Sequence, residues 1–166
     1  MAAQTNLAQT VQLAFYHPDH KDVLYSFDLP QEQMQFTGMP TDVLEPAIQD
    51  EHQYPIVILA DSRPVGFFIL HNSETRIEYT DNETALLLRA FSVNNADQGK
   101  GYAKQALLQL KDFVQQSFPQ VEEIVLAVNM RNLAARQVYL KTGFLDEGRT
   151  RMGAIGPQHV LVMPIF

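Results

Sequence analysis

Apolar and polar residues alternate along the first half of the chain in a pattern that predicts β-strands. The first strand is expected over three alternating apolar residues, Val11, Leu13 and Phe15. Two apolar runs, 56–60 and 65–70, flank the turn-like stretch 61–64 and therefore predict an antiparallel hairpin. A further run from Ala85 to Val93 is nearly all apolar, which is typical of a strand buried on both faces.

The second half of the chain changes period. After Gly101 the apolar residues recur every three or four positions, which predicts an amphipathic helix that Pro119 ends. A buried strand over 124–128, a helix over 132–143 between an Asn N-cap and a Gly stop, and a last strand over 160–162 follow. This order predicts a parallel crossover within a mixed sheet, an α/β fold.

The segment 19–51 is less regular than the rest of the chain. Short helices are expected over 20–27 and 42–49, since Pro30 and the Thr-Gly-Met-Pro turn at 37–40 interrupt the pattern between them. We therefore expect this segment to contribute helices rather than strands.

The length and composition limit the architecture. A chain of 166 residues with 46% hydrophobic content can form one compact domain with a substantial core, so a single domain over 1–166 is expected. No apolar run reaches the roughly 18 residues of a membrane span, and the first ten residues lack the segments of a secretion signal. We expect a soluble, cytoplasmic protein that does not contact the membrane.

Charge and residue usage exclude several classes of function. The net charge of −7 argues against a nucleic-acid-binding protein, which needs clustered Lys and Arg, and favours a small or cationic substrate. The absence of cysteine excludes thiolate ligands and a cysteine nucleophile. Only His17 and His20 are close-spaced histidines, with Pro18 between them and no third ligand, so no metal site is expected.

The glycine loop before the long helix, Gln98-Gly-Lys-Gly-Tyr-Ala103, is the most informative stretch. A Walker loop needs two glycines four residues apart, then Lys and Ser or Thr, which this loop lacks. A dinucleotide fingerprint needs a small residue where Lys104 stands and an acid after the next strand. A helix N-terminus nevertheless offers about four unpaired N–H groups, and glycines let a diphosphate approach them. On its own the loop is also compatible with a plain helix start after a glycine turn.

Two motifs together indicate a family. The stretch 98–103 resembles the Gln/Arg-x-x-Gly-x-Gly/Ala signature of the GNAT superfamily of acyl-CoA-dependent N-acyltransferases. The stretch 132–144 is similar to its second signature, with Asn, Ala, Tyr and Gly-Phe at matching spacings, and Phe91-Ser92-Val93 stands where the family has a strand end beside its cofactor. The resemblance covers residues 85–147 and implies the GNAT fold: a mixed sheet of about six to seven strands, about four flanking helices, and a cleft between splayed parallel strands.

The resemblance also implies the residues of the site. The expected cosubstrate is acetyl-CoA, with no metal, bound by Phe91, Val93, Gln98, Gly99, Lys100, Gly101, Tyr102, Ala103 and Asn132. The backbone N–H of Val93 is expected to polarise the thioester carbonyl. Tyr139 is expected to protonate the departing CoA thiolate. Asp97 departs from the family pattern, and its charge is expected to disfavour diphosphate binding slightly.

The acceptor implied by the resemblance is a primary amine that attacks the thioester directly. An alkylammonium with a pKa near 10.4 costs about 4.6 kcal/mol to deprotonate at pH 7, so a proton acceptor is needed. Asp28, Glu32, His71 and Glu78 qualify by residue type alone, and a water relay is the alternative.

The N-terminal layout over 29–36 is loosely similar to that of bacterial polyamine acetyltransferases, and an acidic chain suits a polycation. Other small amines, aminoglycosides, and protein N-termini or lysines are alternative acceptors. A catalytically silent CoA-binding relative, acting as a sensor or binding module, is the alternative from another class of function. A homodimer is a further expectation, since dimers are frequent in the family.

Overall fold

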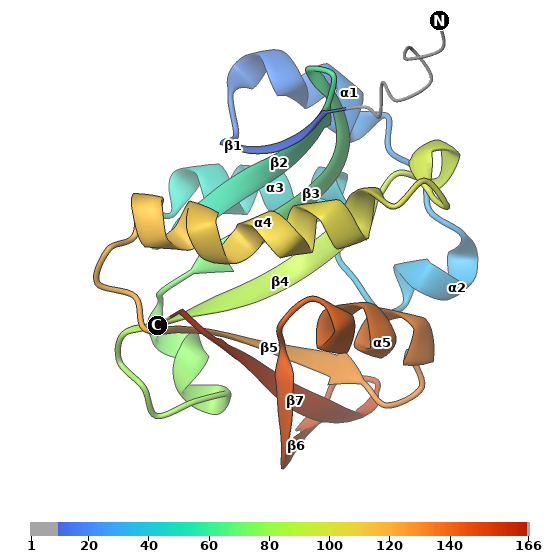
Figure 1. Ribbon diagram of the computed structural model, residues 1–166. Coiled ribbons are helices and arrows are strands. Elements are labelled where there is room, and N and C mark those ends of the chain that lie inside the picture. The colour runs from blue at the N-terminus through green and yellow to red at the C-terminus, as the bar shows by residue number, and fades with distance from the viewer. Residues whose placement is uncertain (1–9, 166) are drawn as a thin grey trace, which may run out of the picture.

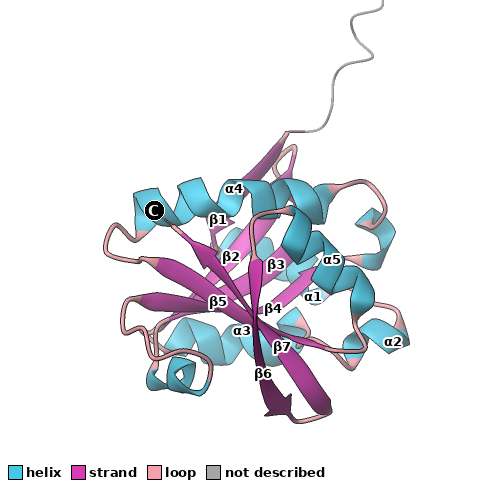
Figure 2. Ribbon diagram, turned by 60° about the horizontal axis from the view of Figure 1, so that its bottom comes forward, coloured by secondary structure: helices cyan, strands magenta, loops and turns pink. Residues whose placement is uncertain are grey.

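A seven-stranded mixed sheet with helices on both faces forms the core of the computed structural model, which describes residues 10–165 (Figure 1, Figure 2). The strands lie in the order β1-β2-β3-β4-β5-β7-β6. Their bounds are β1 Val11–Phe15, β2 Gln53–Ala60, β3 Arg63–His71, β4 Ala85–Val93, β5 Glu123–Asn129, β6 Leu145–Gly153 and β7 Gly156–Pro164. The helices are α1 Lys21–Tyr25, α2 Gln31–Met34, α3 Pro40–Gln49, α4 Tyr102–Ser117 and α5 Leu133–Lys141, with 3-10 turns η2 Pro18–His20, η3 Glu74–Glu78 and η4 Asn95–Asp97.

The predicted fold class is confirmed, and so are the two pairings that define it. β2 and β3 form the expected antiparallel hairpin, while β4 and β5 are the parallel pair joined through α4. The hairpin turn is tighter than expected, because Asp61 and Ser62 both adopt positive φ, 49° and 70°. Positive φ at both central residues defines the two-residue turn that matches the twist of paired strands, so β3 begins already at Arg63.

Each face of the sheet has its own core. On one face Leu107 and Leu110 of α4 pack with Leu86 and Leu88 of β4. On the other face side chains of α1 and α3 pack with Val57 and other residues of β2 and β3. Figure 2 shows α4 and α3 on opposite sides of the sheet. The two apolar faces explain why the run from β2 to β4 contains few polar residues.

Apart from 3-10 turns, two elements were absent from the sequence-based prediction. One is α2, only four residues long, which brings the number of α-helices within residues 10–165 to five. The other is β6, an edge strand of mostly exposed and half-exposed residues, including Arg149 and Arg151. An edge strand buries little apolar surface, so it lacks the alternation that marks a strand in sequence. β7 is also longer than the predicted 160–162.

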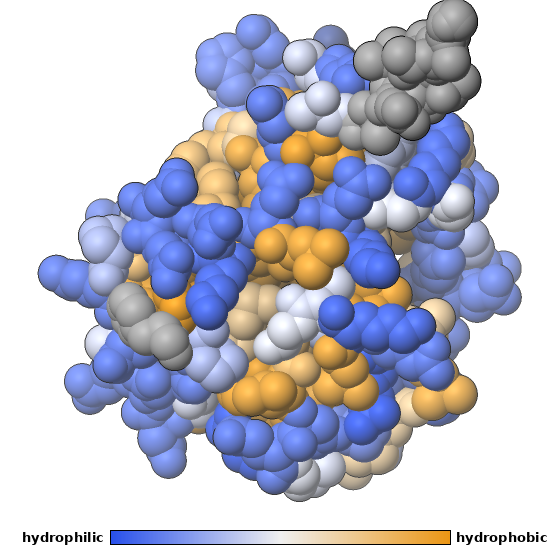
Figure 3. Space-filling model, in the orientation of Figure 1, coloured by the Kyte–Doolittle hydropathy of each residue, from blue (hydrophilic) through white to orange (hydrophobic). Residues whose placement is uncertain are grey.

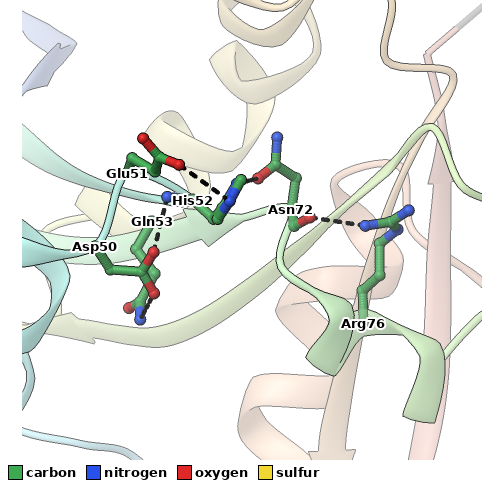
Figure 4. A network of polar contacts seen from close by, with 6 residues as sticks. All are labelled: Asp50, Glu51, His52, Gln53, Asn72 and Arg76. Carbon is green, nitrogen blue, oxygen red and sulfur yellow. Dashed lines mark hydrogen bonds and ion pairs between the residues drawn. The ribbon is translucent and has the colours of Figure 1, made fainter.

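A polar network stabilises the end of the sheet where β4 and β5 are still paired (Figure 4). The carboxylate of Asp50 accepts hydrogen bonds from the His52 backbone N–H (2.9 Å) and the Gln53 side-chain amide (3.0 Å). A ring nitrogen of His52 lies 3.2 Å from the amide oxygen of Asn72, whose backbone carbonyl accepts from Arg76 at 2.7 Å. The start of β2, the end of β3 and η3 are thereby held together.

Hydrophilic residues cover most of the face that carries α4 and α5, with small apolar patches among them (Figure 3). None of the helices within residues 10–165 has the length and apolar character needed to cross a bilayer.

Candidate active site

A gap opens between the two parallel strands at the centre of the sheet. β4 and β5 pair only from Ala85–Glu123 to Leu87–Val125, although β4 continues to Val93 and β5 to Asn129. The strands therefore separate toward their carboxyl ends. The resulting cleft has a volume of about 780 Å³, within the range of small-molecule sites.

The glycine loop lies at the mouth of this cleft. Gly99 and Gly101 have φ of +79° and +82°, a region that side chains disfavour, and a Cβ at Gly99 would meet nothing within 4 Å. Gly101 is the N-cap of the 16-residue helix α4, and no side chain caps that terminus. The first N–H groups of α4, from Tyr102 to Lys104, thus lack both intrahelical and side-chain partners. These features fit a diphosphate held by main-chain amides.

The loop residues of the predicted site differ in what their side chains can do. Lys100 is exposed, and Ala103 is half-buried and lines the cleft. Tyr102 has its ring in the core, 4% exposed, so only its backbone faces the loop. The side-chain amide of Gln98 donates to the carbonyl of Val93 (2.9 Å) and to Gln33 of α2 (2.9 Å), and accepts from Gln33 (3.2 Å). Gln98 therefore acts through its contacts with β4 and α2.

The backbone of Val93 is oriented toward the cleft. The N–H of Asn94 donates to the carbonyl of Val65 at 2.9 Å, so these two residues form a hydrogen-bonded pair of the antiparallel β3–β4 ladder. Adjacent pairs alternate, so Val93, opposite Gly66, directs its N–H and C=O away from β3. The carbonyl is taken by Gln98, whereas β5 has already separated from β4 at this level. The Val93 N–H is thus directed into the cleft.

The helix α5 contributes the far wall of the cleft. Asn132, its N-cap, accepts a hydrogen bond from the Ala135 backbone N–H at 3.3 Å, so the expected cap is present. Asn132, Ala135 and Tyr139 follow helical spacing and all line the cleft. The Tyr139 ring packs edge-on against Phe91 (6.1 Å between centroids) and Phe144 (5.5 Å).

Tyr139 carries a phenol that stays protonated. Burial raises the pKa of the Tyr139 hydroxyl well above its ordinary value of 10. No hydrogen bond to this hydroxyl occurs among residues 10–165. A cleft-lining phenol in its protonated form, held by two aromatic contacts, can donate a proton or a hydrogen bond to a group in the cleft.

Asp97 is placed differently from what its position in the loop suggested. Its carboxylate is 3% exposed and forms a two-point contact with Arg63, at 2.9 and 3.3 Å. Lys100 Nζ lies 4.0 Å from the same carboxylate. The charge of Asp97 is thus balanced by neighbouring cations, and the expected repulsion of a diphosphate is correspondingly weakened.

The four candidate bases do not lie together. Glu32, on α2, lines the cleft. His71 is 1% exposed, bonds Ser73 Oγ at 2.8 Å, and does not line the cleft; burial lowers the pKa of His71 to about 4. Asp28 is exposed outside the cleft, and Glu78 pairs with Arg151 at 3.4 Å. Only Glu32 keeps a position from which it could reach an acceptor.

Sequence reasoning missed several polar residues of the cleft. These are Arg89 of β4, Lys104 in the first turn of α4, Arg131 and Asn129 at the end of β5, and Gln158 of β7. Lys104 had a readable signal, since a cation in the turn that follows a glycine loop lies near any bound phosphate. The others come from strands whose neighbours depend on long-range pairing.

The close-spaced histidines serve a local structural purpose. His17 Nδ1 accepts from the Asp19 backbone N–H, and the His17 N–H donates to His20 Nδ1, both at 3.1 Å. They form the N-terminal cap of η2. In the part of the chain that the structure describes, no three His, Asp or Glu side chains gather as a metal site.

Comparison with known proteins identifies the family. A family model described as "Acetyltransferase (GNAT) family" matches residues 21–144. A curated relative, "Uncharacterized N-acetyltransferase YbbJ" of Bacillus subtilis (strain 168), is 47% identical over 156 residues, covering 93% of this chain and 98% of its own.

Solved structures share the fold at low sequence identity. The aminoglycoside acetyltransferase AAC(6')-Ib, in complex with coenzyme A, aligns with a TM-score of 0.76 at 20% identity, over 93% of this chain and 95% of that one. Spermidine N-acetyltransferase from Vibrio cholerae, in complex with CoA and spermine, aligns with a TM-score of 0.69 at 15% identity, over 93% and 95%. At such identities the alignments establish the fold.

Proposed function

Because this chain belongs to the GNAT family and is an N-acetyltransferase, we propose that its acyl donor is acetyl-CoA and that its acceptor is a small primary amine. The amine attacks the thioester directly while both substrates are bound. The new N–C bond replaces the C–S bond, the amine releases one proton, and the thiolate of CoA takes one up. No acyl-enzyme is involved.

One observation carries this proposal: the glycine loop opens onto the gap between β4 and β5. The uncapped N-terminus of α4 supplies main-chain donors, Gly99 and Gly101 leave room for a diphosphate, and Lys100 and Lys104 add positive charge beside it. From the diphosphate site the gap runs along β4. The extended chain of amides and methylenes that links the diphosphate of CoA to its thiol fits between the two separated strands.

The reactive end would then meet the backbone of β4. The N–H of Val93 faces the gap and can donate to the oxygen on which negative charge develops during attack. A single donor of this kind contributes about 3 kcal/mol where it has been measured. The donor belongs to the main chain, so among substitutions only one by proline would remove it.

Tyr139 is the proposed proton donor to the departing thiolate. It lines the cleft, and its raised pKa keeps the phenol protonated at any physiological pH. Transfer from a phenol to a thiolate with an ordinary pKa of about 8.5 is uphill, so the donor must be close when the C–S bond breaks. The aromatic contacts with Phe91 and Phe144 fix the ring for this purpose.

The test measures thiol release from acetyl-CoA across a panel of amines, for the wild type and for Tyr139→Phe. We expect Tyr139→Phe to lower kcat at least tenfold while calorimetric CoA binding stays within threefold. Tyr54→Phe is the matched control, because Tyr54 is also half-buried against an aromatic ring, Phe118 at 4.9 Å, but lies outside the cleft. Unchanged turnover in Tyr139→Phe removes Tyr139 from its role. CoA binding without turnover of any amine favours the alternative of a CoA-binding sensor.

A further inference from the structure

The charge inside the cleft differs from the charge of the whole protein. The chain has a net charge of −7, but the charged residues that line the cleft are three cations, Arg89, Lys104 and Arg131, and two acids, Glu32 and Asp97. Asp97 is neutralised by Arg63, which does not line the cleft. The interior of the cleft is thus cationic, and Glu32 is its one unpaired acid within residues 10–165.

The cations of the cleft fall into two groups. Lys104 belongs to the first turn of α4, beside the glycine loop, where it suits the diphosphate. Arg89 lies opposite Ile69 and Val93 opposite Gly66, so Arg89 is three residues of β3, or about 10 Å, deeper along the sheet. Lys104 at the loop and Arg89 on β4 are therefore expected to contact different parts of the molecules bound in the cleft.

Arg89 also faces a different side of the sheet. Leu86 and Leu88 belong to the core beneath α4, whereas Leu87 packs with Val125 and other residues on the opposite face. Side chains alternate along a strand, so Arg89 continues the face of Leu87, away from α4. Arg89 is exposed and has no ion pair or hydrogen bond among the described residues.

The second arginine meets the same carbonyl as Asn129, whose side chain continues the face of Val125. Arg131 follows β5, donates to the Ile155 carbonyl in the β6–β7 turn at 3.2 Å, and stacks over the ring of Phe36 at 5.7 Å. These contacts fix its direction and leave it without a carboxylate partner within residues 10–165. Its guanidinium can still donate to an anion, since a carbonyl takes only one of its N–H groups.

β7 adds an amide donor to the same face, since Gln158 alternates with Val160 and Val162 along the strand. Gln158 pairs directly with Asn129 across β5 and β7, and both residues line the cleft. The Oε1 of Gln158 accepts from Arg151 at 2.6 Å, which directs its NH₂ group the other way. Two guanidinium groups and one amide donor on one face are the groups that bind carboxylate and phosphate oxygens.

Resting on the proposed function, we infer that the acceptor is an amine that carries a carboxylate or phosphate group, held by Arg89 and Arg131 on the face of the cleft away from α4. The same cations favour catalysis. A positive charge near an ammonium group disfavours its protonated form, so an amine bound beside Arg89 loses its proton more readily. A polycation such as spermidine would meet like charges there instead.

The test compares amines that differ only in the anionic group: L-lysine with cadaverine, L-phenylalanine with phenethylamine, and glucosamine 6-phosphate with glucosamine. Thiol release from acetyl-CoA gives kcat/KM for each. We expect at least one anionic member to exceed its partner at least tenfold, and the carboxylate and phosphate pairs show which anion is recognised. The inference would be overturned if the amines lacking the anion, or spermidine, gave a kcat/KM equal to or higher than that of the anionic amines. It would also be overturned if no amine of the panel reacted while acetyl-CoA binding was intact.

Charge-removing variants assign the effect to the two arginines. Arg89→Gln and Arg131→Gln should each reduce the preference for the anionic amine at least tenfold, chiefly through KM, and change the acetyl-CoA dissociation constant less than threefold. Lys111→Gln is the control, because Lys111 is an exposed cation on α4 outside the cleft. A tenfold loss of acetyl-CoA affinity with the preference retained would place the arginines in the cofactor site and refute the inference. Failure of the wild type to bind acetyl-CoA would instead refute the proposed function.

Discussion

The side chain of Gln98 ties the end of β4 to α2, and its removal should reduce turnover more than it reduces stability. Gln98→Ala loses three hydrogen bonds: one to the Val93 carbonyl and two exchanged with Gln33. At about 0.5–1.5 kcal/mol for each bond, the free energy of unfolding should fall by about 1.5–4.5 kcal/mol. Gln33→Ala is the matched control, since it loses the two exchanged bonds and should cost about 1–3 kcal/mol while the Val93 carbonyl stays bonded.

The two variants should separate more clearly in kcat. The Val93 carbonyl shares its direction with the Val93 N–H, the proposed oxyanion donor, so freeing the carbonyl lets that donor move. A misplacement of about 1 Å can cost about 100-fold in rate. We expect kcat to fall 10- to 100-fold in Gln98→Ala and less than threefold in Gln33→Ala, by thiol release at saturating acetyl-CoA, with urea unfolding for stability. A wild-type kcat in Gln98→Ala, or equal losses in both variants, would refute this reasoning.

Three further predictions concern stability and the loop. His71 has a pKa of about 4 when folded and an ordinary 6.5 when unfolded. Its contribution of about 3 kcal/mol to the free energy of unfolding should therefore be complete above pH 6.5 and decline as the pH falls toward 4. Urea unfolding of His71→Gln that retained the wild-type dependence on pH would contradict this. Asp97→Asn should lower the free energy of unfolding by about 1–3 kcal/mol, less than the loss of a fully buried ion pair, because the Arg63 side chain is 49% exposed. A double-mutant cycle with Arg63→Gln that gave a coupling energy below about 0.5 kcal/mol would contradict this prediction. Gly101→Ala places a side chain at φ +82°, with only Gln105 nearby at 3.7 Å. The substitution should therefore destabilise the fold by about 1–2 kcal/mol and weaken CoA binding measured by calorimetry. Unchanged stability together with unchanged CoA binding would count against this geometry of the loop.

The elements that could be predicted from sequence are those that bury a regular apolar pattern. The 16-residue helix α4 and the strand β4 each carry such a pattern, and their bounds lie close to the predicted ones. The strand β6 carries no regular apolar pattern. It is held in place instead by pairing with β7 and by an ion pair between Arg136 and Asp146, at 2.6 Å. Likewise α2 is held by the contact of Gln33 with Gln98, 65 residues away. Neither contact leaves a local signal.

The same division applies to the candidate site. The glycine loop and the face of α5 that carries Tyr139 are local motifs, so their resemblance to the two GNAT signatures was enough to predict that they line one cleft. Arg89 left a faint signal, as a lone cation in an otherwise apolar strand. Its meaning depends on where β5 separates from β4, a consequence of pairing between distant segments. The acceptor side of the cleft was therefore beyond the reach of sequence patterns, and overall acidity gave the opposite impression of its charge.

The backbone of β4 links the opening of the cleft to the direction of the proposed oxyanion donor. Two residues, Ala90 and Phe91, stand opposite the single residue Phe68 of β3, which is a β-bulge, and Ala90 adopts φ 58°. A non-glycine residue in this conformation costs about 1–2 kcal/mol, and the stacking of Phe91 on Phe68, at 5.6 Å, offsets part of that cost. The bulge shifts the register by one residue and so reverses which N–H groups of β4 face β3 beyond it. Without the extra residue, Val93 would turn its N–H into the ladder with β3, and the gap would lack its donor.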